Sequence, residues 1–448
     1  MPDKWPLANG NWSNAANWNG GTKPVAGDDV YADSRTLNVD EDFTVATLRT
    51  TQRSGGTVGG TFLFNTAGVT GTVTSANPLV PGATNMVQIT ATTGTVTFSL
   101  GGSVAPRNAN GETLINYTGN CNFSVTGTNF NGATGNSNTQ VFNKTSAGTI
   151  TITGNLNGGT ATNAATLVST NGNTIIIGNV VGGTGASGGN RAISQSAGTL
   201  TVTGNVTGGQ GTFSNQGILF SGTSLTVTGT VTGGIASLAI ESTAPINTIN
   251  GNILGGTVSG IGVSGNTIVN GNMTAGVSPA LGSSSAIQLQ VTGTVTASST
   301  AVAINMTNAN GQVYLNGNMV NNNGKMAIFA PIVWLDTTGT TSAAFFTSGG
   351  VARTLYSADT VPNQPAQNNV RFNTVYGPGN SLTGTCVMPV AANSRNGVVY
   401  DNGTVGTALF TTSLFLTELS SSTVPVAVRM QNLCTPMILG ELMEAYKR

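Results

Sequence analysis

The side chains best suited to metal binding or acid–base catalysis gather within the first 50 residues of the chain. The acidic members of this group are Asp28, Asp29, Asp33, Asp40, Glu41 and Asp42. Carboxylate oxygens are the ligands that Ca²⁺ prefers. The alternative is a solvated charged loop that keeps strand edges from pairing with other chains, and we favour this alternative because charge is a common protection of exposed edges. We therefore predict no metal site.

The middle of the chain carries almost no group that does chemistry. Between residues 150 and 330 the ionisable acids and bases are Glu241, Arg191 and Lys325, and histidine occurs nowhere in the 448 residues. Glycoside hydrolysis uses a pair of carboxylates, and a serine triad needs histidine. Two carboxylates could form such a pair only if they came from neighbouring chains, for example Glu241 of one chain with Asp336 of another in a homotrimer. We predict no catalytic residue, no cofactor and no enzymatic activity.

Sugar binding by aromatic rings is a further chemistry to weigh. Phe213, Phe220 and Tyr314 lie near turns of variable length, where an exposed ring would stack on a sugar. We expect these rings to pack in the core instead. Variable turns such as GGTGASGGNR at 182–191 are where binding specificity is expected.

The composition limits the classes of partner. Charged residues make up 7% of the chain and the formal net charge is zero, which argues against binding to nucleic acid or to an anionic membrane. Gly is abundant, with 63 residues, but a hydrophobic content of 38% argues against a disordered chain. The N-terminus, MPDKWPLANG, has no apolar signal segment. We expect folding in a cytoplasm, with Cys121, Cys386 and Cys434 as buried thiols.

One phrase recurs along the chain with small changes. It appears as TITITGNLNGG at 149–159, NTIIIGNVVGG at 173–183, TLTVTGNVTGG at 199–209 and SLTVTGTVTGG at 224–234. The glycine in the middle of each copy marks eight positions: Gly154, Gly178, Gly204, Gly229, Gly251, Gly271, Gly293 and Gly317. The intervals are 24, 26, 25, 22, 20, 22 and 24 residues. A period in this range with strand-like content indicates a solenoid.

Each copy contains three short strands, which predicts an all-β fold: a parallel β-helix with one rung per copy. In the copy at 199–209, Leu200 and Val202 face the bore, while Gly204 and Asn205 turn the corner. A propeller needs a longer period, and a sandwich does not explain the near-uniform spacing. The residue after the marked glycine suits an internal stack of amides and tolerates a left-handed corner. The predicted turn ladder is Asn155, Asn179, Asn205, Asn252, Asn272 and Asn318, with Thr230 and Thr294 as replacements in two rungs.

The ends of the chain differ from the middle. We predict an N-terminal cap with the first rungs at 1–60, the β-helix at 61–345, two small β-modules of 24 residues at 346–420, and a C-terminal segment at 421–448. That last segment contains one short amphipathic helix. Its apolar stripe is Leu439, Leu442, Met443 and Tyr446, spaced at i, i+3, i+4 and i+7. A helix of this length needs a surface to pack on, either its own cap or a docking partner.

Two stretches resemble known proteins. GNWSNAANWNGGTKPVAGDDVYA at 10–32 resembles the first rung of β-helical surface and phage proteins. PAQNNVRFNTVYGPGNSLTGT, from Pro365, and PVAANSRNGVVYDNGTVGT, from Pro389, resemble short β-modules of tailed-phage virion proteins, although Ser394 departs from that pattern. The resemblance implies a right-handed, pectin-lyase-like parallel β-helix.

The same resemblance implies a non-enzymatic virion protein: a tail spike or fibre, or a spike that decorates the capsid. It implies a homotrimer, assembled with other virion proteins in the host cytoplasm and able to contact a host-surface glycan. Two alternatives stay open. One is a bacterial cell-surface adhesin, which would need an export signal and an anchor. The other is a polysaccharide-degrading tailspike, which the scarcity of acids opposes.

Overall fold

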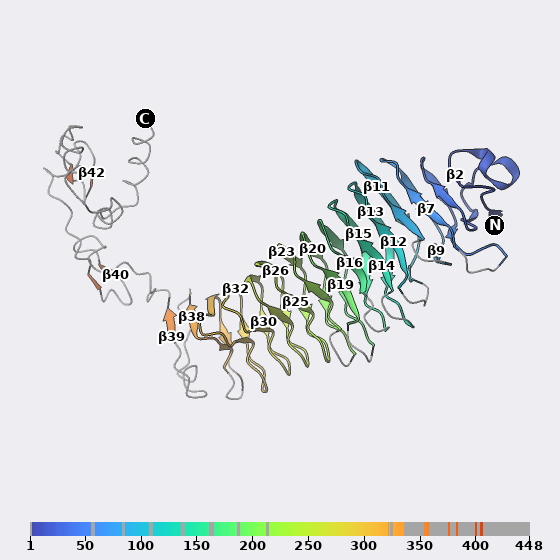
Figure 1. The fold of residues 1–448 in the computed structure, drawn as a ribbon. Coiled ribbons are helices and arrows are strands. Elements are labelled where there is room, and N and C mark those ends of the chain that lie inside the picture. The colour runs from blue at the N-terminus through green and yellow to red at the C-terminus, as the bar shows by residue number, and fades with distance from the viewer. Residues whose placement is uncertain are drawn as a thin grey trace, which may run out of the picture. The chain divides into compact units, whose positions relative to one another are not determined.

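The computed structural model describes residues 2–335, except for 55–58, 83–85, 107–110, 136–138, 161–164, 186–188, 212–214, 321 and 323–325, and short strands between 354 and 405. The chain divides into two units, Met1–Leu355 and Tyr356–Arg448. The first unit is a stack of strands (Figure 1). Every strand pairing described in it is parallel, apart from one isolated antiparallel bridge between Pro6 and Trp18. This confirms the all-β fold and the parallel β-solenoid.

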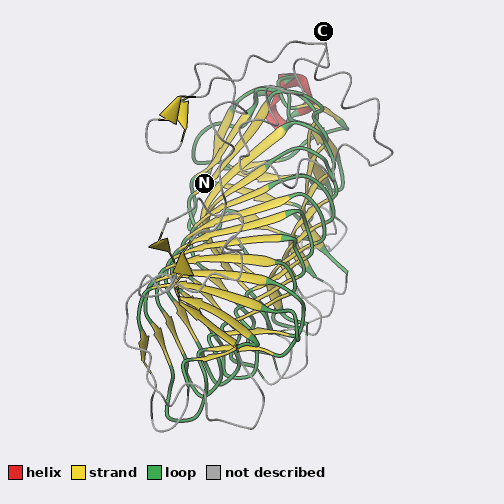
Figure 2. Ribbon diagram, turned by 90° about the vertical axis from the view of Figure 1, so that its left-hand side faces the viewer, coloured by secondary structure: helices red, strands yellow, loops and turns green. Residues whose placement is uncertain are grey.

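Sheet 1 has fourteen strands, one from each successive turn. They are β2 (Gly10–Asn11), β4 (Thr36–Asn38), β7 (Thr61–Phe64), β10 (Val87–Ile89), β12 (Thr113–Tyr117), β14 (Gln140–Lys144), β16 (Ala165–Ser169), β19 (Arg191–Gln195), β22 (Ile218–Phe220), β25 (Ile240–Ser242), β28 (Ile261–Val263), β31 (Leu281–Ser283), β34 (Ile304–Met306) and β37 (Ile328–Phe329). The chain crosses this sheet once per turn and then bends into sheet 2 (Figure 2).

Sheet 2 holds the remaining strands of the rungs. From Gly178 to Gly317 the marked glycine separates a longer strand from a shorter one, whereas Gly154 lies within a single strand. The longer strands are β5 (Phe43–Val45), β8 (Thr70–Val73), β11 (Thr95–Leu100), β13 (Asn122–Asn131), β15 (Ile150–Asn157), β17 (Thr174–Ile177), β20 (Thr199–Thr203), β23 (Ser224–Thr228), β26 (Ile246–Asn250), β29 (Asn266–Asn270), β32 (Gln288–Thr292), β35 (Gln312–Asn316), β38 (Ile332–Leu335) and β39 (Thr354–Ser357). The shorter strands are β18 (Val180–Val181), β21 (Val206–Thr207), β24 (Val231–Thr232), β27 (Ile253–Leu254), β30 (Met273–Thr274), β33 (Val295–Thr296) and β36 (Met319–Val320).

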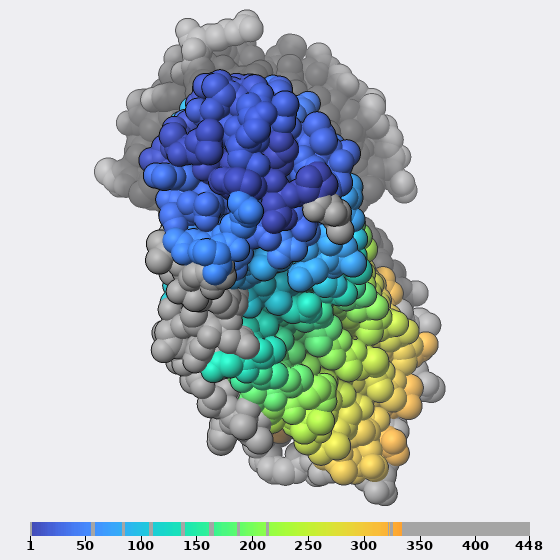
Figure 3. Space-filling model, turned by 90° about the vertical axis from the view of Figure 1, so that its right-hand side faces the viewer, coloured from blue at the N-terminus to red at the C-terminus, as the bar shows by residue number. Residues whose placement is uncertain are grey.

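Sheet 3 and two short 3-10 turns belong to the N-terminal end. Its strands are β1 (Asp3–Lys4), β3 (Asp29–Tyr31), β6 (Thr47–Arg49) and β9 (Leu79–Val80), and the turns are η1 (Ala15–Asn17) and η2 (Asn19–Gly21). Trp12 and Trp18 are fully buried here, with ring centroids 5.0 Å apart, and Trp12 lies 4.4 Å from the ring of Phe43. The aromatic rings fill the first rungs of the bore, and the N-terminal residues cover one end of the rod (Figure 3).

The second unit contains two described hairpins. Strand β40 (Val375–Tyr376) pairs antiparallel with β41 (Leu382–Thr383), and β42 (Val399–Tyr400) pairs antiparallel with β43 (Thr404–Val405). Tyr376 and Tyr400 are the equivalent residues of the two 24-residue copies, so each copy contains one hairpin at the same place. The segment boundaries drawn from the sequence stay predictions, and the helix with Leu439 lies outside the described residues.

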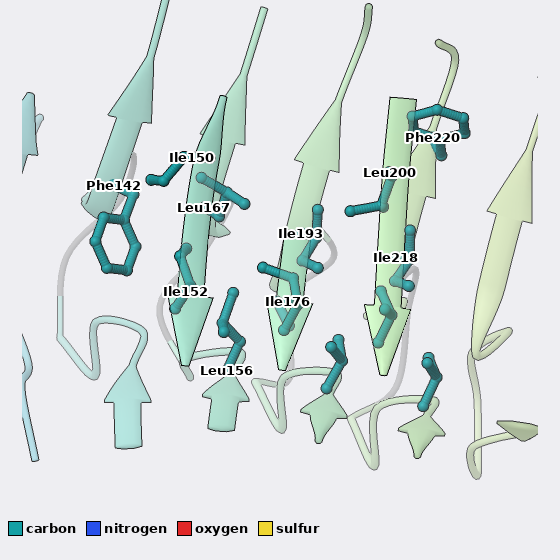
Figure 4. Packing of buried hydrophobic residues seen from close by; sticks show 14 of the residues in the cluster. Phe142, Ile150, Ile152, Leu156, Leu167, Ile176, Ile193, Leu200, Ile218 and Phe220 are labelled. Atoms are coloured by element: carbon teal, nitrogen blue, oxygen red, sulfur yellow. The ribbon is translucent and has the colours of Figure 1, made fainter. Parts of the chain in front are cut away.

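The core is a set of vertical columns in which one residue of each rung lies on the equivalent residue of the next. The main column of sheet 1 is Leu37, Phe62, Val87, Ile115, Phe142, Leu167, Ile193, Ile218, Ile240, Ile261, Leu281, Ile304 and Ile328, all buried. Side chains of sheet 2, such as Ile152 and Ile176, point into the same interior (Figure 4). Burial of each such side chain contributes about 1.5–3 kcal/mol.

A column of glycines shapes the bend in sheet 2. Gly204 has φ of +152°, and Gly154, Gly178 and Gly229 adopt the same region at +142° to +155°. A Cβ on Gly204 would overlap the carbonyl oxygen of Gly178 in the rung before. The glycine is therefore needed twice, for its backbone conformation and for the close approach of two rungs. We expected the asparagine that follows to tolerate a left-handed conformation as well, but none of the ladder asparagines has a positive φ, so the glycine alone adopts it.

We predict that Gly204→Ala destabilises the rod far more than Gly68→Ala does. Both glycines have positive φ, but a Cβ on Gly68 (φ +81°) meets no atom within 4 Å. Gly68→Ala should cost about 1 kcal/mol of unfolding free energy from backbone strain, and Gly204→Ala about 3 kcal/mol or more from strain plus overlap with the Gly178 carbonyl. Urea unfolding of the two variants measures the difference. Equal losses would contradict the role of close rung contact.

Candidate binding surface

The predicted turn ladder exists, but it lies on the outer surface of the rod. The Oδ1 atom of Asn155 accepts the backbone amide of Asn179 (3.0 Å), and Asn179 accepts the amide of Asn205 in the same way (2.9 Å). Asn155 is half-buried and the other five asparagines of the ladder are exposed. The expected internal stack is wrong, because the chain bends at the glycine and turns the next side chain outward. The inward position is taken by Val206, two residues after Gly204.

The replacements in this ladder keep the same bond. The Thr230 amide donates to Oδ1 of Asn205 (2.9 Å), and the Thr294 amide donates to Oδ1 of Asn272 (2.8 Å). Asn252 bonds to the amide of Asn272 likewise (2.9 Å). The asparagine supplies the acceptor and any residue with a backbone amide completes the bond, so this ladder stabilises the stacking of rungs. The Asn318 carbonyl accepts the Val295 amide (2.8 Å).

Each of the acidic residues near the N-terminus has its own hydrogen-bond partner. Asp40 accepts the amide and the hydroxyl of Ser13 (2.9 and 2.6 Å), and Asp42 accepts the amide of Thr70 (2.7 Å). The remaining bonds are Asp28 with the Val25 amide (2.9 Å), Asp29 with the Thr47 hydroxyl (2.6 Å), Asp33 with the Arg53 amide (3.3 Å) and Glu41 with Lys23 Nζ (2.5 Å). In the described ranges no three His, Cys, Asp or Glu side chains form a metal-binding group. Most of these acids join one turn to another.

The charged residues of the middle of the rod are linked through an amide. The guanidinium Nε of Arg191 donates to Oε1 of Gln216 (3.0 Å), and Nε2 of Gln216 donates to Oε2 of Glu241 (2.5 Å). Burial lowers the pKa of Arg191, and the negative charge of Glu241 acts in the opposite direction. The sequence named Arg191 and Glu241 separately and missed Gln216, the residue that bridges them across successive turns. The carboxylate is thus engaged in a structural chain of bonds.

A second polar set lies inside the bore, where sheet 1 ends and the chain turns. Lys144 is fully buried, and its Nζ donates to the carbonyl of Ser146 (2.8 Å) and to that of Asn171. Its register neighbour Tyr117 donates to the Cys121 carbonyl. These side chains fold back on the turn and satisfy carbonyls that would otherwise be buried without a partner. No pattern in the sequence marks this lysine as buried, since its position in the column depends on the stacking.

The aromatic residues considered for sugar binding differ in their burial. Phe220 is fully buried, as expected, and Phe213 lies outside the described residues. The expectation that Tyr314 packs in the core is wrong. Its side chain is 36% exposed and lies on the outer face of strand β35, not on a turn. Alternation along the strand explains this, since Val313 and Leu315 point inward.

The variable turn at 182–191 is closed by a backbone bond from the Gly183 amide to the Asn190 carbonyl (2.9 Å). The equivalent turn of a later rung is closed by a bond from the Gly256 amide to the Val258 carbonyl, so the loop shortens along the rod.

The described part of the chain also has a shallow hollow of about 270 Å³, bordered by Pro81 and Pro106 among others, with no charged side chain in its lining.

Several predicted features lie outside the described residues. These are Asp336, Lys325, Cys386, Cys434, Leu439, Leu442, Met443 and Tyr446. Cys121 is among the described residues; it is a buried free thiol, as expected. Among the described residues no helix has the length and apolar character needed to cross a membrane.

The fold and surface define a parallel β-solenoid with mostly polar, largely uncharged outer faces. Comparison with known protein families, with curated proteins and with solved structures finds no match.

We predict that the stability of the rod rises with pH between about pH 8 and 9 because of Lys144; above pH 9 the Cys121 thiol, whose pKa is raised by burial, acts in the opposite direction. Burial lowers the pKa of this lysine to about 8, from an ordinary value near 10.5. In that window the unfolded chain binds a proton that the folded chain has released, so the free energy of unfolding increases with pH, by about 1 kcal/mol per pH unit. Urea unfolding at several pH values measures this slope.

Lys144→Met should remove the rise, whereas Lys4→Met, at the partly exposed N-terminal strand, should keep it. The comparison uses the slope with pH and does not depend on the absolute stability of either variant. A Lys144→Met protein whose stability still rises by the same amount would contradict the assignment.

Proposed function

We propose that this chain is a non-enzymatic structural protein of a tailed-phage virion. It forms a β-helical spike or fibre on the tail or the capsid, assembles as a homotrimer with other virion proteins in the host cytoplasm, and contacts the host surface. The proposal combines the rod fold with the motifs at 10–32 and from Pro365 and Pro389 that resemble virion proteins.

The observation that carries the non-enzymatic part is the state of Glu241. It is the one carboxylate in the sequence between residues 150 and 330, and it is bonded to Gln216 at 2.5 Å. Hydrolysis of a glycosidic bond uses an acid and a second carboxylate in the same site. A carboxylate that holds an amide in place, with no second acid along the same rungs, supports a role in stability.

The rod is suited to hold a partner at a distance. Fourteen strands of sheet 1 at the usual separation of about 4.8 Å give a stack of roughly 60 Å. Neighbouring rungs are joined by backbone bonds along their strands, and several of them also by the asparagine ladder at the bend. Rungs that repeat the same contacts extend a rod without a change of chemistry.

We predict that purified virions from cells that make this protein carry it on their surface. An antibody against residues 435–448 should label the tail or the capsid in electron micrographs, and light scattering should give the soluble protein three times its chain mass of 45.0 kDa. Particles from a deletion strain are the control. Unlabelled particles would refute the virion role, and depolymerisation of a host polysaccharide by the purified protein would refute the non-enzymatic role.

A further inference from the structure

The outward side chains of sheet 2 change in type along the rod. On β20 they are the threonines Thr199, Thr201 and Thr203, whereas β17 carries Ile175 and Ile177 and β29 carries Asn266, Ile268 and Asn270. On the two strands β32 and β35 they are mostly amides with one aromatic ring. We call this set the amide–aromatic patch, and it consists of Gln288, Gln290, Thr292, Gln312, Tyr314 and Asn316. Part of this change serves the stacking of rungs, since Nδ2 of Asn270 donates to Oδ1 of Asn250 (2.8 Å) and the Thr292 hydroxyl donates to Oδ1 of Asn270 (3.1 Å), but these bonds do not involve Gln288, Gln290 or Tyr314.

The patch is a flat grid of two rows. In the parallel register Gln288 lies beside Gln312, Gln290 beside Tyr314, and Thr292 beside Asn316. Neighbouring strands are about 4.8 Å apart, and same-face residues on a strand are about 6.6 Å apart. A sugar ring that lies on this grid contacts side chains of both rows. Strand β38 follows β35 in the sheet, with Trp334 in register with Tyr314.

The ring of Tyr314 is held in place at the surface. Its hydroxyl donates to Oε1 of Gln312 at 2.8 Å, which fixes the side chain while leaving it 36% exposed. The exposed Ile268, 37% accessible, is the register neighbour of Gln290 and widens the apolar part of the face. An ordered aromatic ring costs little further entropy when a ligand binds on it.

The chemistry of the patch fits an uncharged sugar. Aromatic rings offer an apolar face with a polar edge, and pyranose rings carry a C–H face that packs on it. The amides of Gln288, Gln290 and Asn316 are exposed and each supplies a donor and an acceptor, which is what sugar hydroxyls require. The outward residues of β29, β32 and β35 include no charged side chain, so nothing there selects an anionic polymer.

We propose that the amide–aromatic patch binds one face of a neutral oligosaccharide, with a sugar ring on Tyr314 and its hydroxyls bonded to Gln290 and Gln288. The proposal deepens the proposed function and rests on it for the source of the glycan, since a rod on a particle meets the glycans of a cell surface. The site binds and does not cleave, because no carboxylate lies among its residues.

The test uses the full-length protein and four neutral probes: cellohexaose, chitohexaose, mannohexaose and a β-1,4-galactan hexamer. Calorimetry measures the affinity, and saturation-transfer NMR shows which sugar protons contact the protein. We expect millimolar or tighter binding of at least one probe, with saturation strongest at the protons of a ring face. Failure of all four to bind overturns the proposal.

Variants locate the site. Tyr314→Ala should weaken binding about tenfold or more, and Tyr314→Phe, which keeps the ring but loses the bond to Gln312, should weaken it by a smaller factor. Gln290→Ala should weaken it as well. The matched control is Thr201→Ala, which lies in the same outward column as Tyr314, five turns earlier, and should bind like the native chain. Circular dichroism confirms the fold of each variant.

Three results would overturn the proposal. Binding that survives Tyr314→Ala places the sugar elsewhere, and equal loss in Thr201→Ala shows that the whole face acts without a specific site. A native protein that Tyr314→Ala converts from oligomer to monomer makes the patch a subunit interface. These outcomes are separate from the proposed function, because labelling of virions tests that role whether or not a sugar binds.

Discussion

The rest of the structure depends on the close vertical stacking of one rung on the next at the bend of sheet 2. At that point the glycine of each rung lies so near the carbonyl of the preceding glycine that no side chain fits between them, as Gly204 and Gly178 show. Backbone contact at every rung fixes the register of the strands on both sides. The columns of aliphatic side chains in the bore and the asparagine ladder outside it both follow from that register.

Stacking also explains where polar groups are tolerated. Inside the bore a polar side chain needs a hydrogen-bond partner in its own turn or the next, as Lys144 has in the carbonyls of Ser146 and Asn171. Outside the bore a charge is free to hydrate, yet the middle of the rod has few charges and links two of them through Gln216. The result is a surface whose chemistry resides in hydroxyls, amides and a few exposed apolar side chains. Such a surface suits weak polar recognition and contact with other chains.

The sequence predicted the fold well and the surface poorly. The recurring glycines, with Leu200 and Val202 in alternation before Gly204, were enough for the solenoid and for the direction of the inward side chains. The burial of Phe220 was also expected. The exposure of Asn205, the position of Tyr314 on a strand face and the burial of Lys144 were not. Each of these depends on the place of a residue relative to a neighbouring rung.

The rung can therefore be predicted from the amino-acid sequence alone: its three strands, its inward residues and the glycine at its bend. These are local properties, because period-two alternation and a glycine are visible within about ten residues. The tertiary structure decided which residues of different rungs meet, such as Gln290 with Tyr314, or Arg191 and Glu241 through Gln216. The turns between rungs vary in length, so the register of one rung on the next becomes fixed only when the backbones stack.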